Sequence, residues 1–136
     1  MEHLTLEQLD NSAKELLSSL ANKTLSVKDR LQIPPQIMPT QDAKARVCNM
    51  NEVALGYSEA QVKVEALRCL QCKNAPCVKG CPVGIDIPRF IAQAAEGDYE
   101  SSVQVIKEAS MLPAICGRVC PQESQCQLSC TVAKSL

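Results

Sequence analysis

The sequence has very few aromatic side chains, with no Trp, one Phe and two Tyr in 136 residues. A core without large aromatic groups must be built from Leu, Ile, Val and Ala, which each bury less surface. Hydrophobic residues nevertheless make up 46% of the chain, a fraction that is typical of globular proteins. We therefore expect one domain, or a small domain with an extension, whose core needs additional support.

The sequence also lacks a strong charge of either sign, because 14 Lys and Arg oppose 15 Asp and Glu. No net field would attract nucleic acid or an anionic membrane. The N-terminal stretch MEHLTLEQLD has neither the basic segment nor the apolar run of a secretory signal, and no apolar stretch approaches the roughly 18 residues that span a bilayer. We expect a cytoplasmic protein without a nucleic-acid or membrane partner.

Helical signals recur along the chain, and no convincing stretch alternates between apolar and polar residues. Thr5 with Gln8, and Ser58 with Gln61, have the spacing of capping boxes. Asp86 and Gly97 are a suitable N-cap and C-terminal glycine for a further helix. We predict an all-α fold. The helix that begins after Ser58 is expected to carry Cys69 at its end. The predicted helices cover residues 5–21, 59–70, 87–96 and 99–109.

Between the first two helices the chain is expected to be irregular over residues 22–58. The stretch QIPPQIMPT contains three prolines, which remove backbone donors and disfavour helix in the residues before them. We interpret this stretch as an extended arm that lies on another surface. The predicted organisation is an N-terminal helix with its Pro-rich arm, residues 1–45, followed by the principal domain, residues 46–136.

Nine cysteines are the most informative feature, and eight of them lie between residues 69 and 130. In a reducing compartment such thiols are more often ligands or redox groups than disulfides. The first group has the spacing CxxCxxxxCxxxCP and the second CxxxCPxxxxxCxxxC. If QESQCQLSCTVAKS is helical, Cys126 and Cys130 lie on one face as ligands of one site or of neighbouring sites.

Four interpretations of the cysteines compete. A disulfide framework suits a short secreted chain, and free thiols need no regular spacing. Structural zinc takes four thiolates, usually from two well-separated CxxC pairs. Iron–sulfur ligation fits best, because a four-iron cubane needs one thiolate per iron from several directions. A compact loop can supply three of these thiolates, and a distant segment can supply the fourth.

The runs EALRCLQCKNAPCVKGCPVGIDIPRFI and LPAICGRVCPQESQCQLSC are specific enough to indicate a family. They resemble the N-terminal iron–sulfur domain shared by the NADPH-dependent glutamate synthase small subunit, dihydropyrimidine dehydrogenase and the NADH-dependent ferredoxin:NADP oxidoreductases. The resemblance covers about residues 46–130 and includes NEVALGYSEAQ. It implies an α-helical ferredoxin fold with two [4Fe–4S] clusters.

The resemblance also implies a crossed set of ligands. The first cluster would take Cys69, Cys72, Cys77 and Cys130. The second would take Cys81, Cys120 and Cys126, with a fourth ligand that is typically a Gln or Glu further downstream. We expect that the chain is truncated from a longer flavoprotein and that FAD and NAD(P)H bind in the missing domains, because GxGxxG does not occur here.

Other residues near the clusters have open roles. Cys116 matches a family cysteine that is not usually a ligand, and is either a small buried residue or a recruited fourth ligand. Cys48 and the single histidine, His3, are not expected to be ligands. The nearby cations Lys73, Lys79 and Arg118 could offset the charge of a cluster or be ordinary surface residues. The glycines that could let backbone approach a cluster are Gly80, Gly84 and Gly117.

Two functions remain in view. In the first, the chain is not catalytic alone and carries single electrons between the FAD of an NAD(P)H-dependent oxidoreductase and a partner redox subunit, as in glutamate synthase. In the second, it is a helical module stapled by zinc or another metal, which docks onto a partner or onto a second copy of itself.

Overall fold

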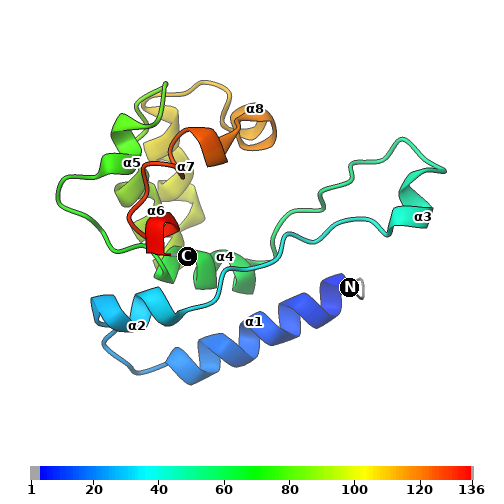
Figure 1. Ribbon diagram of the computed structural model, residues 1–136, viewed down its shortest axis with the longest axis horizontal. Helices are drawn as coiled ribbons and strands as arrows, with labels where there is room; N and C mark the ends of the chain where they lie inside the picture. Colours follow the sequence, from blue (N-terminus) through cyan, green and yellow to red (C-terminus); the bar gives the residue numbers. More distant parts are fainter. Residues whose placement is uncertain (1–3, 136) are drawn as a thin grey trace.

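The computed structural model describes residues 4–135 and consists of helices joined by extended and turn segments (Figure 1). Its described residues form no β-strand, and the one β-type contact is an isolated antiparallel bridge between Thr40 and Ala54. The all-α prediction is therefore confirmed. The helices are α1 (Leu6–Leu20), α2 (Val27–Gln32), α3 (Ala43–Arg46), α4 (Glu59–Leu67), α5 (Pro76–Lys79), α6 (Ile87–Glu96), α7 (Tyr99–Lys107) and α8 (Pro113–Val119), followed by 3₁₀ turns at Gln122–Ser124 and Ala133–Ser135.

Both predicted capping boxes are present. The Thr5 hydroxyl accepts a hydrogen bond from the amide of Gln8 at 3.2 Å, and the Gln8 side chain accepts one from the amide of Thr5 at 2.8 Å. The same reciprocal pair joins Ser58 and Gln61 at 3.3 and 3.1 Å. Each box satisfies two amides that a helix start leaves without partners, so local sequence fixes where α1 and α4 begin.

The buried core lies where α1, α4 and the end of α2 meet. Ala13 and Val64 are fully buried, and Ala60 and Ile33 complete the cluster. All of its members are small or aliphatic, as the scarcity of aromatic residues requires. The half-buried leucines that pack around this cluster are Leu16, Leu17, Leu20, Leu25 and Leu67.

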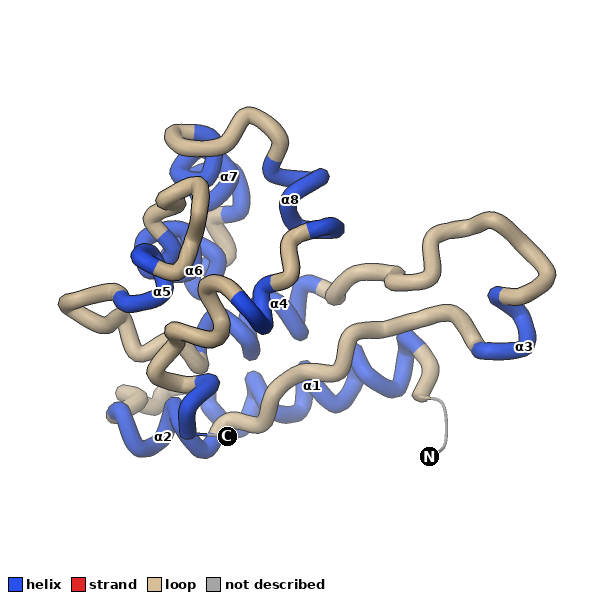
Figure 2. Tube along the Cα trace, turned by 45° about the horizontal axis from the view of Figure 1, so that its top comes forward, coloured by secondary structure: helices blue, strands red, loops and turns tan. Residues whose placement is uncertain are grey.

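A second group of helices covers the opposite side of α4. Helix α4 packs against α6, α6 packs against α7, and α7 contacts α8 (Figure 2). Asp86 caps α6 and Gly97 ends it with a φ of +85°, as predicted. The Ser102 hydroxyl of α7 donates a 2.9 Å hydrogen bond to the carbonyl of Phe90 in α6. The pair α6 and α7 thus forms a packed unit in the chain between the two cysteine segments.

The segment expected to be irregular over residues 22–58 contains two short helices, so that prediction was wrong in part. Ser26 and Asp29 form a third capping box at the start of α2. The Asp42 carboxylate accepts hydrogen bonds from two amides at the start of α3. Neither signal needs tertiary contacts, since both caps act within a single turn.

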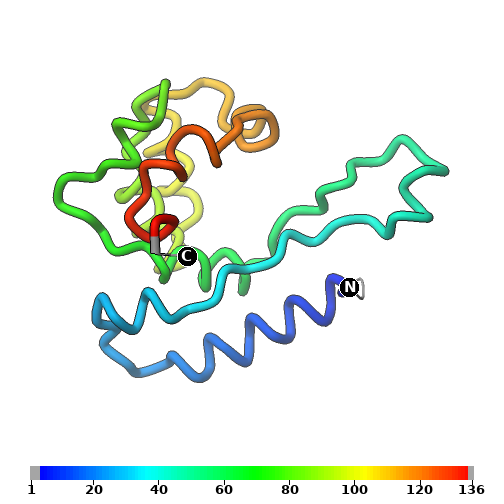
Figure 3. The backbone as a smooth tube through the Cα atoms, viewed as in Figure 1, coloured from blue at the N-terminus to red at the C-terminus, as the bar shows by residue number. Residues whose placement is uncertain are grey.

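The remainder of this segment runs outward from the helices and returns, as Figure 3 shows. We call residues 38–56 the projecting hairpin. Its two sides are joined by hydrogen bonds from the Gln41 amide to the Val53 carbonyl at 2.9 Å and from the Leu55 amide to the Pro39 carbonyl at 2.8 Å. Only residues 38–40 of the hairpin belong to the stretch QIPPQIMPT that was predicted to be extended, and the hairpin contains α3.

Residues 33–37, which we call the anchor segment, lie along α4 and are held by polar side chains. Gln61 donates to the Ile37 carbonyl at 3.0 Å, and Arg68 donates to the Ile33 carbonyl at 3.2 Å. The Tyr57 hydroxyl donates to the Gln36 carbonyl at 3.0 Å. A proline-rich segment cannot satisfy these carbonyls by forming regular structure, so side chains of α4 and its approach supply the donors.

Within residues 4–135, every helix is too short or too polar to cross a lipid bilayer.

Gln61 offers a test of this packing, because it is only 1% exposed and serves both the α4 cap and the anchor segment. Gln61→Leu would keep its approximate volume but leave the Ser58 amide and the Ile37 carbonyl without partners. We expect a loss of about 1–3 kcal/mol in the free energy of unfolding, measured by denaturant titration of the metal-loaded chain. The exposed Gln104 of α7 gives the control Gln104→Leu. Equal stability of the two variants would contradict this role for Gln61.

Candidate metal centre

The first cysteine segment begins where α4 ends. This helix stops at Leu67 with Arg68 as its C-cap, so the prediction that it continues through Cys69 was wrong. The reason lies in α2: Arg30 Nη1 donates to the carbonyls of Leu67 at 2.7 Å and of Cys69 at 3.1 Å. The carbonyls of Leu67 and Cys69 therefore bond to the Arg30 side chain, and Cys69 lies just beyond the end of the helix.

Two tight bends shape the loop that follows. Gln71 and Ala75 both have left-handed backbone conformations, with φ of 50° and 35°. Such conformations are strained for residues other than glycine and are retained where surrounding structure enforces them. The bend at Gln71 brings its amide to the sulfur of Cys69, and its side-chain Nε2 lies 3.5 Å from the same atom. Donors of this kind stabilise a charged sulfur ligand.

The second cysteine segment has less helix than its pattern predicted. Cys116 lies in α8, and Cys120 is the C-cap of that helix. The condition that QESQCQLSCTVAKS is helical is not met, since this stretch contains only 3₁₀ and other turns. The amide of Gln127 bonds to the Gln122 carbonyl at 2.9 Å, which is not the α-helical pattern. Cys126 and Cys130 consequently do not share one helical face.

The two cysteine segments contact each other at Gly80. A Cβ atom at Gly80 would lie 2.8 Å from the backbone oxygen of Gln125 and 2.8 Å from Ser129 Oγ, closer than real Cβ contacts allow. Near this contact, Cys72 Sγ lies 3.6 Å from Thr131 Oγ1. The absence of a side chain at Gly80 thus lets the two segments meet. That Gly80 also lets backbone approach a cluster stays a prediction.

The thiols near this contact interact in one group. Desolvation raises the pKa of Cys69, and the neighbouring sulfurs of Cys130 and Cys72 raise it further. Desolvation likewise raises the pKa of Cys77, with added repulsion from Cys130 and Cys69. The structure therefore brings Cys130 to the loop that holds the other three thiols, despite the length of chain between them.

A second group of thiols surrounds Cys120. Desolvation raises the pKa of Cys120, and the sulfurs of Cys116, Cys81 and Cys126 act in the same direction. Cys116 also lies within hydrogen-bonding reach of Cys120 and 3.7 Å from Ser110 Oγ. The fourth cysteine of the first segment thus neighbours the second segment. The thiols that neighbour Cys120 are thus different from those that neighbour Cys69 and Cys77.

The donor chemistry of these groups fits iron–sulfur clusters. In residues 4–135, no three His, Cys, Asp or Glu side chains converge tightly enough to bind one metal ion. Four part-buried thiols per group, with amides near the sulfurs, are ligands that such a cluster takes.

Comparison with known proteins gives the family. Residues 46–136 match the family described as dihydropyrimidine dehydrogenase domain II, 4Fe–4S cluster. The chain belongs to this family. It therefore contains a 4Fe–4S domain of the type found in these oxidoreductases, which confirms the resemblance inferred from the cysteine motifs.

Relatives of known name include two kinds of redox subunit. The chain is 38% identical to the glutamate synthase [NADPH] small chain of Escherichia coli over 94 residues, which cover 69% of this chain and 20% of that protein. It is 36% identical over 84 residues to the E. coli NAD-dependent dihydropyrimidine dehydrogenase subunit PreT, covering 62% and 20%. For the glutamate synthase [NADPH] small chain of Azospirillum brasilense the identity is 33% over 101 residues, covering 74% and 21%. The chain thus spans about a fifth of the length of these relatives.

The structure also places most of the other residues that the sequence analysis singled out. Cys48 is exposed on the projecting hairpin, and His3 lies outside the described residues. Arg118 forms an ion pair with Glu52 of the hairpin at 2.7 Å, and Lys73 and Lys79 are exposed. The cation that contacts backbone of the first cysteine segment is Arg30, which sequence reasoning missed. No local motif could identify it, because it precedes Cys69 by 39 residues.

Gly80 permits a test of how the two segments meet in this 4Fe–4S domain. Gly80→Ala would place a methyl group against the Gln125 carbonyl, which belongs to the backbone and cannot simply rotate away. We expect the iron content to fall and stability to decrease by about 1–3 kcal/mol, as for other overpacked sites. Iron per chain and the denaturation midpoint report these effects.

Gly117→Ala is the matched control, because nothing lies within 4 Å of a Cβ at Gly117 and its φ is not positive. Iron content and stability should remain near those of the unsubstituted chain. If Gly80→Ala bound as much iron as Gly117→Ala and were equally stable, the contact would not be needed to assemble the site.

Proposed function

We propose that this chain is an electron-transfer module that holds two [4Fe–4S] clusters and passes single electrons between an FAD and a partner redox centre. The observation that carries the proposal is the match of residues 46–136, which contain all nine cysteines, to a 4Fe–4S family. A 4Fe–4S cluster is a one-electron carrier. No residue of the chain is required to make or break a substrate bond in this function.

The proposed ligands follow the crossed pattern. The first cluster takes Cys69, Cys72, Cys77 and Cys130, and the interactions of Cys130 with Cys69 and Cys77 support this set. The second takes Cys81, Cys120 and Cys126, supported by their interactions around Cys120. Its fourth ligand is a Gln or Glu of a longer chain, and Cys116 is the available substitute within this one.

The protein groups around the thiols hold and tune these clusters. Burial excludes water from part of each group, and the Gln71 amide and side chain donate toward Cys69. Hydrogen bonds to ligand sulfur stabilise the more negative, reduced state of a cluster. The residues thereby determine how readily an electron is accepted and released.

The names of the relatives suggest the surrounding enzyme. They include an NADPH-dependent glutamate synthase small chain and a subunit of an NAD-dependent dihydropyrimidine dehydrogenase. We infer that FAD and NAD(P)H bind in domains beyond this one, and that flavin converts hydride transfer into single-electron steps. A larger redox subunit receives the electrons, and a glutamate synthase is the preferred setting.

One observation favours a second function, a docking module with a structural metal. The projecting hairpin carries fully exposed Met50 and largely exposed Val47 (101% and 78%). Exposed apolar groups on a protruding segment suit contact with a partner protein or with a second copy. This function is compatible with electron transfer if a cluster is present, and replaces it if the bound metal is zinc.

Metal analysis of anaerobically purified chain separates the two functions. We expect iron and acid-labile sulfide at about four per chain for one cluster and about eight for two. Chemical reduction should produce the EPR signal of reduced clusters. Zinc in place of iron, with no EPR signal after reduction, would leave only the docking function.

Cysteine variants test the proposed crossed ligands. Cys130→Ser should remove the first cluster, and with it about four irons, although the residue is far in sequence from the loop. Cys116→Ser should retain the iron of that cluster, because Cys116 belongs to the other thiol group. Cys48→Ser on the exposed hairpin is the control for the loss of any thiol. Loss of the same EPR signal in Cys130→Ser and Cys116→Ser would contradict the crossed assignment.

A further inference from the structure

Arg30 connects the N-terminal segment to the first cysteine of the site. It lies in α2, before residue 46, where the family match begins. Its Nη1 donates to the carbonyl of Leu67 at 2.7 Å and to that of Cys69 at 3.1 Å. A guanidinium from outside the matched domain thus contacts the backbone of a cysteine of the 4Fe–4S domain.

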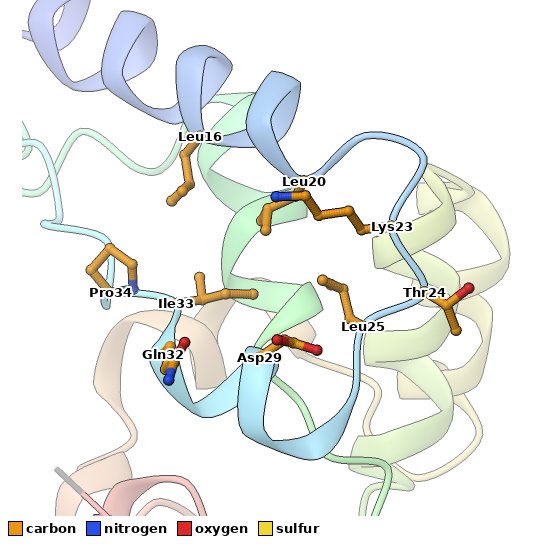
Figure 4. Close-up of a pocket in the computed structure, with 9 residues that line it drawn as sticks. All are labelled: Leu16, Leu20, Lys23, Thr24, Leu25, Asp29, Gln32, Ile33 and Pro34. Atoms are coloured by element: carbon orange, nitrogen blue, oxygen red, sulfur yellow. The ribbon is translucent and has the colours of Figure 1, made fainter.

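Both ends of α2 are fixed, which holds Arg30 in place. The capping box of Ser26 and Asp29 secures the start of the helix. At the other end Ile33 is 4% exposed in the core, and its carbonyl accepts a hydrogen bond from Arg68 of α4. Figure 4 shows Ile33 and Leu25 on either side of α2, facing α1 and bordering a pocket of about 410 Å³.

Arg30 performs a task that the end of α4 requires. The last carbonyls of a helix have no amide partners within it and must be satisfied by other donors. Arg30 Nη1 serves one of them, the Leu67 carbonyl, and also the carbonyl of Cys69 just after the helix. This contact fixes the direction in which the chain leaves α4, and hence the position from which the Cys69 side chain starts.

The charge of Arg30 is not neutralised by a neighbouring acid. Three other arginines have ion-pair partners: Arg68 with Glu65, Arg89 with Glu108 and Arg118 with Glu52. Among the described residues, no carboxylate lies within ion-pair distance of Arg30. Arginine remains protonated at all ordinary pH values, so a full positive charge lies beside the Cys69 backbone.

We propose that Arg30 is a positioning residue for the cluster bound by Cys69, and that its charge raises the reduction potential of that cluster. The proposal rests on the electron-transfer function above. Reduction adds one negative charge to a cluster, and a nearby positive charge stabilises the product more than the reactant. The N-terminal segment would then tune a site whose ligands all lie outside it.

The test uses the iron-loaded 136-residue chain and three variants. Arg30→Gln removes the charge and the two-carbonyl contact, whereas Arg30→Lys keeps the charge but not the planar guanidinium. Lys28→Gln is the matched control, since Lys28 is exposed on the same helix and its loss changes the net charge equally. Potentiometric titration followed by EPR measures the midpoint potential of the signal that Cys130→Ser abolishes, and transfer of iron to a chelator measures how firmly the cluster is held.

We expect the midpoint potential to fall in Arg30→Gln and to stay unchanged in Arg30→Lys and Lys28→Gln. Iron release should be several-fold faster in both Arg30 variants and unchanged in Lys28→Gln. If the role of Arg30 were purely structural, iron release would be faster, but the midpoint potentials of Arg30→Gln and Arg30→Lys would be equal. If Arg30→Gln fails to fold, the test uses Arg30→Lys. Iron release from Arg30→Lys at the rate of the unsubstituted chain would then overturn the proposal.

The failure of this inference is distinguishable from failure of the proposed function. If the unsubstituted chain binds no iron–sulfur cluster, the electron-transfer function itself is wrong. If the clusters form and the potential of Arg30→Gln equals that of Lys28→Gln, electron transfer stands and the role of Arg30 is overturned.

Discussion

The close contact between the two cysteine segments is the constraint on which the rest of the structure depends. At Gly80 the first segment approaches the backbone of the second so closely that a side chain has no room. The helices between them serve this contact, because α6 begins shortly after Cys81 and α7 ends shortly before α8. As an antiparallel pair they carry the chain away from the first segment and return it beside its starting point. Two short, well-capped helices are sufficient to return the chain in this way, and such a helical hairpin requires no large hydrophobic core.

Helix α4 links this contact to the N-terminal part of the chain. One side of it packs with Ala13 and Ile33, and another packs against α6. Polar side chains of α4 and its C-cap donate hydrogen bonds to carbonyls of the proline-containing anchor segment. In turn, Arg30 of α2 donates to the carbonyls of Leu67 and Cys69, at and just after the end of α4. Few large apolar residues are available, so directional hydrogen bonds to backbone perform much of the positioning that aromatic packing performs elsewhere.

Local signals predicted the helix boundaries that a single-turn cap defines. The boxes at Thr5 and Ser58 and the caps at Asp86 and Gly97 act within one turn, so sequence alone was sufficient. The same rule applied to Ser26 would have revealed α2 within the segment expected to be irregular. By contrast, the end of α4 contacts Arg30 of α2, and Gln125, beside Cys126, contacts Gly80 of the first segment. Neither contact can be predicted from a sequence pattern that spans only a few residues. The ligand sets likewise came from a family resemblance, because spacing alone does not show that Cys81 neighbours Cys120.

The thiols that define the site oppose the fold when no metal is bound. Desolvation and neighbouring sulfurs raise the pKa of Cys69, Cys77 and Cys120, so the folded chain favours their neutral forms. A group whose pKa is raised by folding destabilises the folded state once the pH passes its unfolded pKa, because the unfolded chain then releases the proton more readily. Iron reverses this relation, since it binds the thiolates and compensates the charge that repels them. The arrangement that is unfavourable for empty thiolates is therefore favourable for metal-bound ones, and cluster binding and closure of the two segments stabilise each other.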